Sequence, residues 1–88
     1  ASTLTKRGML ALEDGDFAAA DAHFERALDH DPEEAMAYVG KLMVERKVKV
    51  PSDLGRAGKP LETSPNYRKA VRFADPELKK LLEKAKGV

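Results

Sequence analysis

Residues 20–32 read Ala-Asp-Ala-His-Phe-Glu-Arg-Ala-Leu-Asp-His-Asp-Pro, and this stretch decides the fold. Its small and apolar side chains recur at spacings of three and four residues: Ala20, Phe24, Ala27 and Leu28. Such spacing places them on one face of an α-helix. We therefore predict a helix over residues 17–30 whose apolar face is buried against other helices.

The residues before this stretch predict a second helix that pairs with it. We expect this helix to run from about Thr3 to Asp14 and to stop at Gly15. Glycine adopts the left-handed conformation that commonly terminates a helix. Asp16 follows at the position where a carboxylate caps the free amides of the next helix.

Three pairs of a capping residue and a proline predict the starts of further helices. Asp31-Pro32 predicts a third helix that reaches about Lys47, Ser64-Pro65 a fourth, and Asp75-Pro76 a fifth. The side chains expected to point inward from the fifth helix are Leu78, Leu81, Leu82 and Ala85. We therefore expect an all-α domain of about five helices.

Residues 48–63 interrupt this helical pattern. Two prolines and two glycines prevent a long helix in this segment: Pro51, Gly55, Gly58 and Pro60. Its apolar residues Val50, Leu54 and Leu61 are expected to hold the segment against the core.

An internal repeat runs through the chain. Phe24-x-x-Ala27-Leu28 followed by Asp31-Pro32-Glu33 recurs as Tyr67-x-x-Ala70-Val71 followed by Asp75-Pro76-Glu77. Self-similarity at a period of about 20 to 50 residues is typical of stacked helical hairpins. Phe24 and Tyr67 are separated by 67 − 24 = 43 residues.

The first copy resembles the tetratricopeptide repeat, a helical hairpin of about 34 residues. The matching positions are Leu4, Gly8, Ala20, Phe24, Ala27 and Pro32, whereas Arg7 and Ala11 depart from the family pattern. The resemblance implies that Gly8 and Ala20 let the two helices of the hairpin touch. It also implies that Phe24 fills the gap against the next hairpin and that Pro32 begins the next helix.

The second copy is more degenerate. Tyr38 matches the aromatic residue that opens a repeat, but Leu42 and Glu45 replace an expected Gly and Tyr. We interpret residues 1–34 as the first repeat, 35–75 as the second with an insert at 48–63, and 76–88 as a capping helix. The chain lacks an initiator Met, and segments of this family often lie within larger bacterial proteins, so we expect a piece of a longer protein.

The resemblance implies a concave groove, lined by the first helix of each hairpin, in which a peptide docks. The groove residues carried over to this sequence are Thr5, Met9, Leu12, Val39, Met43 and Arg46. Methionine adapts its shape to varied apolar ligands, so the groove would suit an apolar or helical segment. The alternative is that the fifth helix covers these side chains as ordinary core.

The composition argues against chemistry in this chain. The 88 residues include no Cys, and His23 and His30 stand seven residues apart, about 10 Å along a helix, too far to share one metal ion. No serine, histidine and acid are spaced for nucleophilic catalysis, and no apolar stretch reaches membrane-spanning length. We therefore expect a cytoplasmic protein that is not an enzyme and has no metal and no cofactor.

Charge is distributed unequally along the chain. Residues 1–34 carry three bases and nine acids, 3 − 9 = −6, and residues 35–88 carry thirteen bases and six acids, 13 − 6 = +7. Such halves can attract one another within a molecule or between molecules. This asymmetry favours, as a second hypothesis, a structural spacer or self-association domain that forms a weak homo-oligomer.

Nucleic-acid binding through the basic second half is the weakest of the three hypotheses. Its candidate cations are Arg46, Lys47, Lys49, Arg56, Lys59, Arg68, Lys69 and Arg72. Tyr67 and Phe73 lie among them, and aromatic rings can stack on bases. However, the net charge of the chain is only +1, whereas dedicated nucleic-acid binders are strongly basic.

Overall fold

The computed structural model describes residues 3–50, 53–54 and 60–87. The helices in this part of the chain are α1 (Thr3–Glu13), α2 (Phe17–His30), α3 (Ala35–Arg46), α4 (Pro65–Phe73) and α5 (Pro76–Gly87), with a short 3-10 helix η2 (Leu61–Thr63) before α4. No strand occurs among the described residues. The predicted all-α fold with about five helices is confirmed. Part of the inserted segment, at 51–52 and 55–59, lies outside the described residues.

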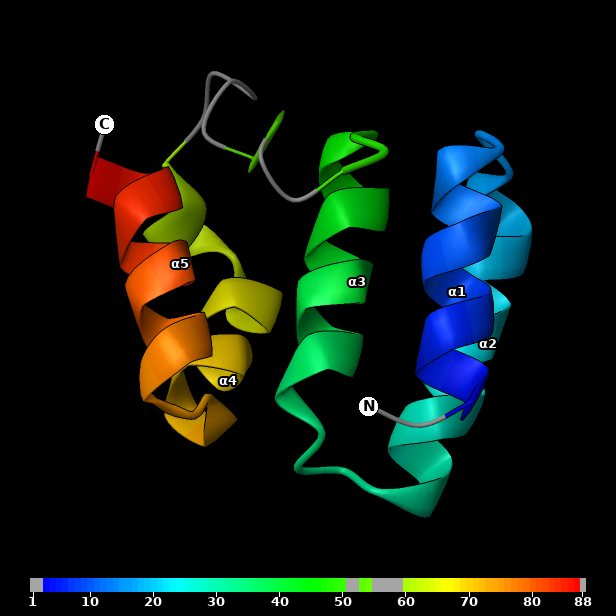
Figure 1. Ribbon diagram of the computed structural model, residues 1–88, viewed down its shortest axis with the longest axis horizontal. Coiled ribbons are helices and arrows are strands. Elements are labelled where there is room, and N and C mark those ends of the chain that lie inside the picture. The colour runs from blue at the N-terminus through cyan, green and yellow to red at the C-terminus, as the bar shows by residue number, and fades with distance from the viewer. Residues whose placement is uncertain (1–2, 51–52, 55–59, 88) are drawn as a thin grey trace.

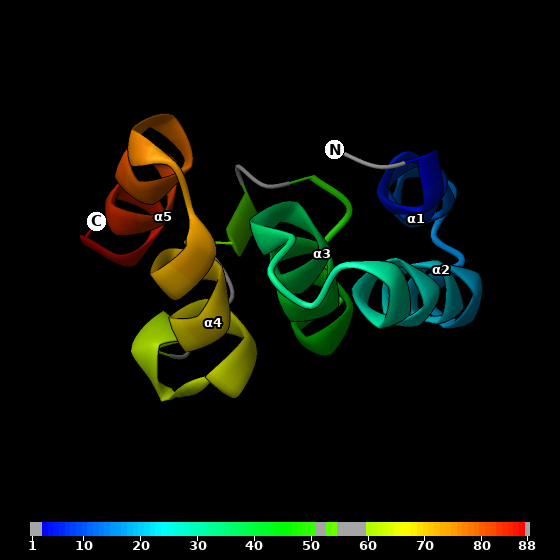
Figure 2. The ribbon, with the colours of Figure 1, turned by 90° about the horizontal axis from the view of Figure 1, so that it is seen from below.

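The helices form two antiparallel hairpins and one further helix (Figure 1). α1 pairs with α2, α3 pairs with α4, and α5 runs in the same direction as α1 and α3. Viewed from below, α1 and α5 lie toward one side of the molecule and α2 and α4 toward the other (Figure 2). The domain measures 30 × 25 × 19 Å, with α1 and α5 at opposite ends of its long axis.

Several helix ends follow the sequence signals. Gly15 ends α1 with a φ of 77°, which is in the left-handed region. The Asp16 carboxylate accepts a hydrogen bond of 3.1 Å from the amide of Ala19, and the Asp75 carboxylate accepts one of 2.8 Å from Leu78. Both aspartates therefore cap the helices that they were predicted to cap.

The start of α3 corrects the sequence prediction. Asp31 and Pro32 do not open this helix, which begins at Ala35 with Glu34 as the N-cap. The Asp31 carboxylate accepts from the Glu33 amide at 3.1 Å, and the Asp31 carbonyl accepts from the Glu34 amide at 3.1 Å. Aspartate side chains commonly close turns in this way, so residues 31–34 form a separate turn before the helix.

Ser64 also differs from its prediction. Pro65 is the first residue of α4, as expected, but the Ser64 side chain makes no capping hydrogen bond. The Ser64 hydroxyl instead donates to a Glu45 carboxylate oxygen at 2.7 Å, which ties the start of α4 to the end of α3. This charge-assisted bond uses the hydroxyl proton, whereas a cap would use the hydroxyl oxygen as an acceptor from a helix amide.

Phe24 is the central packing element of the fold. The side chain is fully buried, and its ring lies against the backbone of Gly8 in α1 and Gly40 in α3. A Cβ atom placed at either glycine would lie under 3.0 Å from ring carbons of Phe24. The side chain that lies closest to Gly8 is thus Phe24, and Ala20 is also fully buried. The expected role of Phe24 between hairpins is borne out, and Gly40 is a partner that the sequence prediction missed.

A polar network fixes α2 against α3 on the outer side of this contact. Lys41 in α3 forms ion pairs with Asp21, at 3.0 Å, and with Glu25. Burial alone would lower the pKa of Lys41, but the hydrogen bonds and negative charges of Glu25 and Asp21 outweigh burial, and the pKa is raised. Lys41 therefore remains charged and bridges the two helices.

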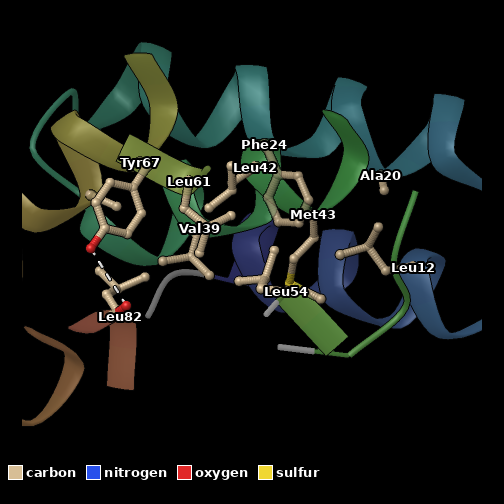
Figure 3. Packing of buried hydrophobic residues seen from close by; sticks show 11 residues of the cluster. Leu12, Ala20, Phe24, Val39, Leu42, Met43, Leu54, Leu61, Tyr67 and Leu82 are labelled. Atoms are coloured by element: carbon tan, nitrogen blue, oxygen red, sulfur yellow. Dashed lines mark hydrogen bonds between the residues drawn. The ribbon is translucent and has the colours of Figure 1, made fainter. Parts of the chain in front are cut away.

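Tyr67 repeats the role of Phe24 at the other end of the core. It is 6% exposed, and its hydroxyl donates to the carbonyl of Leu82 in α5 at 3.5 Å (Figure 3). Leu82 is fully buried, but Leu81, which was predicted to point inward, is 46% exposed. The apolar face of α5 is therefore wider than the surface that covers it.

Gly40→Ala should lower the free energy of unfolding by about 1–3 kcal/mol, because the new methyl group meets the Phe24 ring. The sign is informative, since alanine alone favours a helix over glycine by about 1 kcal/mol. In a Phe24→Leu background the same substitution should cost little or even stabilise, since the ring is absent. Urea unfolding of the four proteins measures this coupling, and equal costs in both backgrounds would contradict the proposed contact.

Stability should fall at alkaline pH. Burial, then the charges of Glu62 and Glu83, raise the pKa of Tyr67 above its ordinary value of 10.0, and the pKa of Lys41 is raised above 10.5. Groups whose pKa is higher in the folded state stabilise it below the unfolded pKa and lose this contribution as pH rises through the folded pKa. The contribution of these two groups to the unfolding free energy should therefore be constant below about pH 10 and decrease above it.

Tyr67→Phe removes one of these two groups. The variant should lie within about 1 kcal/mol of wild type at pH 7, because a single long hydrogen bond is lost, and it should lose less stability above pH 10. Thermal unfolding followed by circular dichroism between pH 7 and 11 tests this. An identical alkaline decrease in both proteins would rule out a contribution from Tyr67.

Candidate functional site

Most of the predicted groove residues are buried. α1 and α3 run side by side, and Thr5, Leu12, Val39 and Met43 between them are 1% exposed or less. Met9 and Arg46 are half-buried. The structure therefore corrects the extent of the predicted groove, because four of its six residues are almost fully buried in the core of this chain.

The inserted segment provides much of the cover. Leu54 and Leu61 are 1% and 3% exposed and belong to the same buried cluster as Leu12, Val39 and Met43 (Figure 3). Residues 47–50, which follow α3, lie on the same side of the molecule as α1 and α5 (Figure 2). The expected anchoring by Leu54 and Leu61 is thus confirmed, whereas the third expected anchor, Val50, is 40% exposed.

Arg46 secures this cover rather than lining a groove. Its Nη2 donates to the Pro60 carbonyl at 3.0 Å, and its side chain is only 6% exposed. The neighbouring Glu45 accepts from the Ser64 hydroxyl at 2.7 Å and from the Asn66 amide at 3.3 Å. The last turn of α3 therefore holds both the end of the inserted segment and the start of α4.

One part of the predicted groove remains open. It is a hollow of about 430 Å³ between α1 and the start of α3, lined by Thr5, Lys6, Met9, Leu10 and Met36. We call it the α1/α3 hollow. Leu10 is 59% exposed, and Met9 and Met36 are half-buried. The Thr5 hydroxyl donates to the Glu34 carboxylate, which links α1 to the residue that precedes α3.

Lys6, Leu10 and Met36 were not among the predicted groove residues. Leu10 lies on the side of α1 opposite the residues that pack on α2 and α3. Helical periodicity assigns that side to the solvent, so it does not mark Leu10 as a binding residue. Met36 stands one helical turn before Val39 and could have been found from that spacing. The spacing in the sequence therefore indicates the side of α3 that faces the groove. It does not indicate which part of the groove remains exposed to solvent.

The lining of the hollow is mostly apolar. It holds three apolar side chains, one hydroxyl that is engaged with Glu34, and one lysine. Within residues 3–50, 53–54 and 60–87, no group of three or more His, Cys, Asp or Glu side chains is arranged to hold a metal ion. Ligand sites that recognise other molecules are mostly apolar with a few polar groups, and the α1/α3 hollow fits that description.

The basic second half of the chain offers few free aromatic faces. Tyr67 is buried, and Phe73 stacks on Tyr38 with ring centroids 6.0 Å apart. Lys69 lies 5.7 Å from the centre of the Tyr38 ring and Arg72 lies 5.4 Å from that of Phe73. These rings and cations are thus used within the fold. Arg56 and Lys59, two of the candidate cations, lie outside the described residues.

None of the helices in the described part of the chain is both long and apolar enough to span a bilayer. The sequence matches no protein-family model, no curated protein and no solved structure.

Leu54→Ala should lower the free energy of unfolding by about 2–4 kcal/mol, because it opens a cavity over Val39 and Met43. Val50→Ala is the matched control in the same segment. Val50 is 40% exposed, and its truncation should cost about 0.5 kcal/mol or less, as at other surface positions. Chemical denaturation gives both values, and equally small costs would show that the segment does not cover the core.

Proposed function

We propose that this chain is a protein-interaction module of the tetratricopeptide type, which binds the apolar face of a helical segment at the α1/α3 hollow. The observation that carries this proposal is the exposure of Leu10, at 59%, beside the half-buried Met9 and Met36 in one concave surface. Burying a leucine of this kind stabilises a complex by about 1.5–3 kcal/mol.

The shape and chemistry of the hollow favour a helix as the ligand. Two flexible methionines beside one leucine can adapt to apolar side chains at positions i and i+3 or i+4 of an amphipathic helix. Lys6 at the edge of the hollow is exposed. It favours a partner helix that carries an acidic residue next to its apolar stripe.

The likeness to the tetratricopeptide repeat supports this proposal. Ala20, Phe24 and Ala27, three of the residues that carry the likeness, are all buried, and Phe24 packs against both hairpins. In that family the first helices of successive hairpins line the surface that meets the ligand, and here these are α1 and α3. A small contact area leads us to expect weak, reversible binding.

The ligand can be sought with a phage-displayed library of amphipathic helical peptides selected against the full chain. Selected peptides should share apolar residues at helical spacing, and their complex should shift the amide NMR signals of Thr5, Met9, Leu10 and Met36. Leu10→Asp should weaken their binding about tenfold or more, because it places a charge in an apolar contact.

Ala22→Asp is the matched control, since Ala22 is exposed on α2, outside the hollow. Met43→Asp is unsuitable because Met43 is fully buried and its substitution tests folding instead. Selection that enriches no helical pattern, or peptides that bind the Leu10→Asp protein as well as wild type, would refute the proposal.

A further inference from the structure

The structure itself contains a helix of the kind that the α1/α3 hollow is expected to bind. α5 carries an apolar stripe in which Leu82 is fully buried, Leu78 is half-buried and Leu81 is 46% exposed. We propose that α5 of one copy docks along α1 of a second copy, with Leu81 against Leu10, and that the chain thereby self-associates head to tail. This inference rests on the proposed use of the hollow and names its partner.

The two leucines lie at the two ends of the molecule. Leu10 and Leu81 are two of the three large hydrophobic residues most exposed among the described residues, and Val50 is the third. Leu10 belongs to α1 and Leu81 to α5, the helices at opposite ends of the long axis (Figure 1). Exposed leucines on two different end helices give a heterologous pair of surfaces, which does not close on itself when copied.

The charges beside the leucines select a parallel arrangement. Lys6 and Glu77 each precede their leucine by four residues, which is about 6 Å along a helix. Glu13 and Lys84 each follow their leucine by three residues, about 4.5 Å along the axis. With Leu10 and Leu81 level and the helices parallel, Lys6 therefore meets Glu77 and Glu13 meets Lys84.

All four of these charged residues are exposed. In the antiparallel arrangement Lys6 would instead approach Lys84, and Glu13 would approach Glu77. Juxtaposed like charges suppress such a pairing. The charges on either side of the Leu10–Leu81 contact thus favour the parallel orientation over the antiparallel one.

The fold already orients α5 of one copy parallel to α1 of the next, so no rearrangement is needed. α1, α3 and α5 all run in the same direction (Figure 1), so a shift along the long axis brings α5 of one copy beside α1 of the next. The charge of −6 on residues 1–34 and of +7 on residues 35–88 adds a long-range attraction between unlike ends. Since one helix edge on each side forms the contact, the interface is small and the association weak.

Sedimentation velocity of the full chain over about 10 µM to 1 mM covers the range expected for a weak interface. Wild type should show a mass that rises with concentration and falls as salt is added, because charge pairs at a surface are screened. Leu10→Asp and Leu81→Asp should each remain monomeric. A mixture of these two variants should form a dimer that does not grow, since each variant keeps one intact end.

Charge reversal provides a second, independent test. Glu13→Lys alone and Lys84→Glu alone should each weaken association about tenfold, because each places two like charges together. The double variant Glu13→Lys/Lys84→Glu should restore association, because each interface again joins unlike charges. Ala22→Asp, on the exposed side of α2, is the control and should assemble like wild type.

A wild-type chain that stays monomeric up to about 1 mM would overturn the inference. So would a mixture of Leu10→Asp and Leu81→Asp that does not pair while wild type associates, since that result indicates a symmetric contact. Leu81→Asp leaves the hollow intact and should still bind the selected helical peptides. A wild-type chain that binds the selected peptides but does not self-associate would therefore refute this inference alone, whereas peptide binding that is insensitive to Leu10→Asp would refute the proposed function.

Discussion

The contact of the Phe24 ring with the backbones of Gly8 and Gly40 determines how the hairpins stack. A ring from α2 can lie against both α1 and α3 only where neither helix carries a Cβ atom. Because protein interiors are packed as densely as organic crystals, this single close approach sets the distance between the first helices of the two hairpins. Their parallel course follows from the two chain reversals that separate α1, α2 and α3, and Thr5, Met9 and Met36 come together beside this contact.

The inserted segment explains why this small chain has a complete core. A domain of 88 residues buries a limited share of its surface, and two stacked hairpins alone would leave Leu12, Val39 and Met43 open to water. Leu54 and Leu61 close that face, with Arg46 and Glu45 holding the end of the segment and the start of α4. The same cover that stabilises the fold reduces the groove to the short hollow beside Leu10.

The two ends of the molecule share one design. α1 and α5 each expose a leucine flanked by opposite charges, and both run in the direction that the internal stacking of α1 on α3 already uses. An apolar centre supplies affinity, whereas charges at its edge fix orientation and register. The contact proposed between copies would thus place α5 beside α1 in parallel, as α1 lies beside α3 within one chain.

The sequence by itself determined the helices, because periodic apolar residues, Gly15, Asp16 and Asp75 act through contacts only a few residues apart. It also indicated that Phe24 packs between hairpins. It could not place the start of α3, where Asp31 and Pro32 satisfy both a helix signal and a turn. Only the tertiary structure decided that Met43 is core while Leu10 faces water, since burial depends on Leu54 and Leu82, which are distant in the chain. An apolar side chain on one face of a helix can contact either another element or the solvent, and packing between residues distant in the sequence determines which.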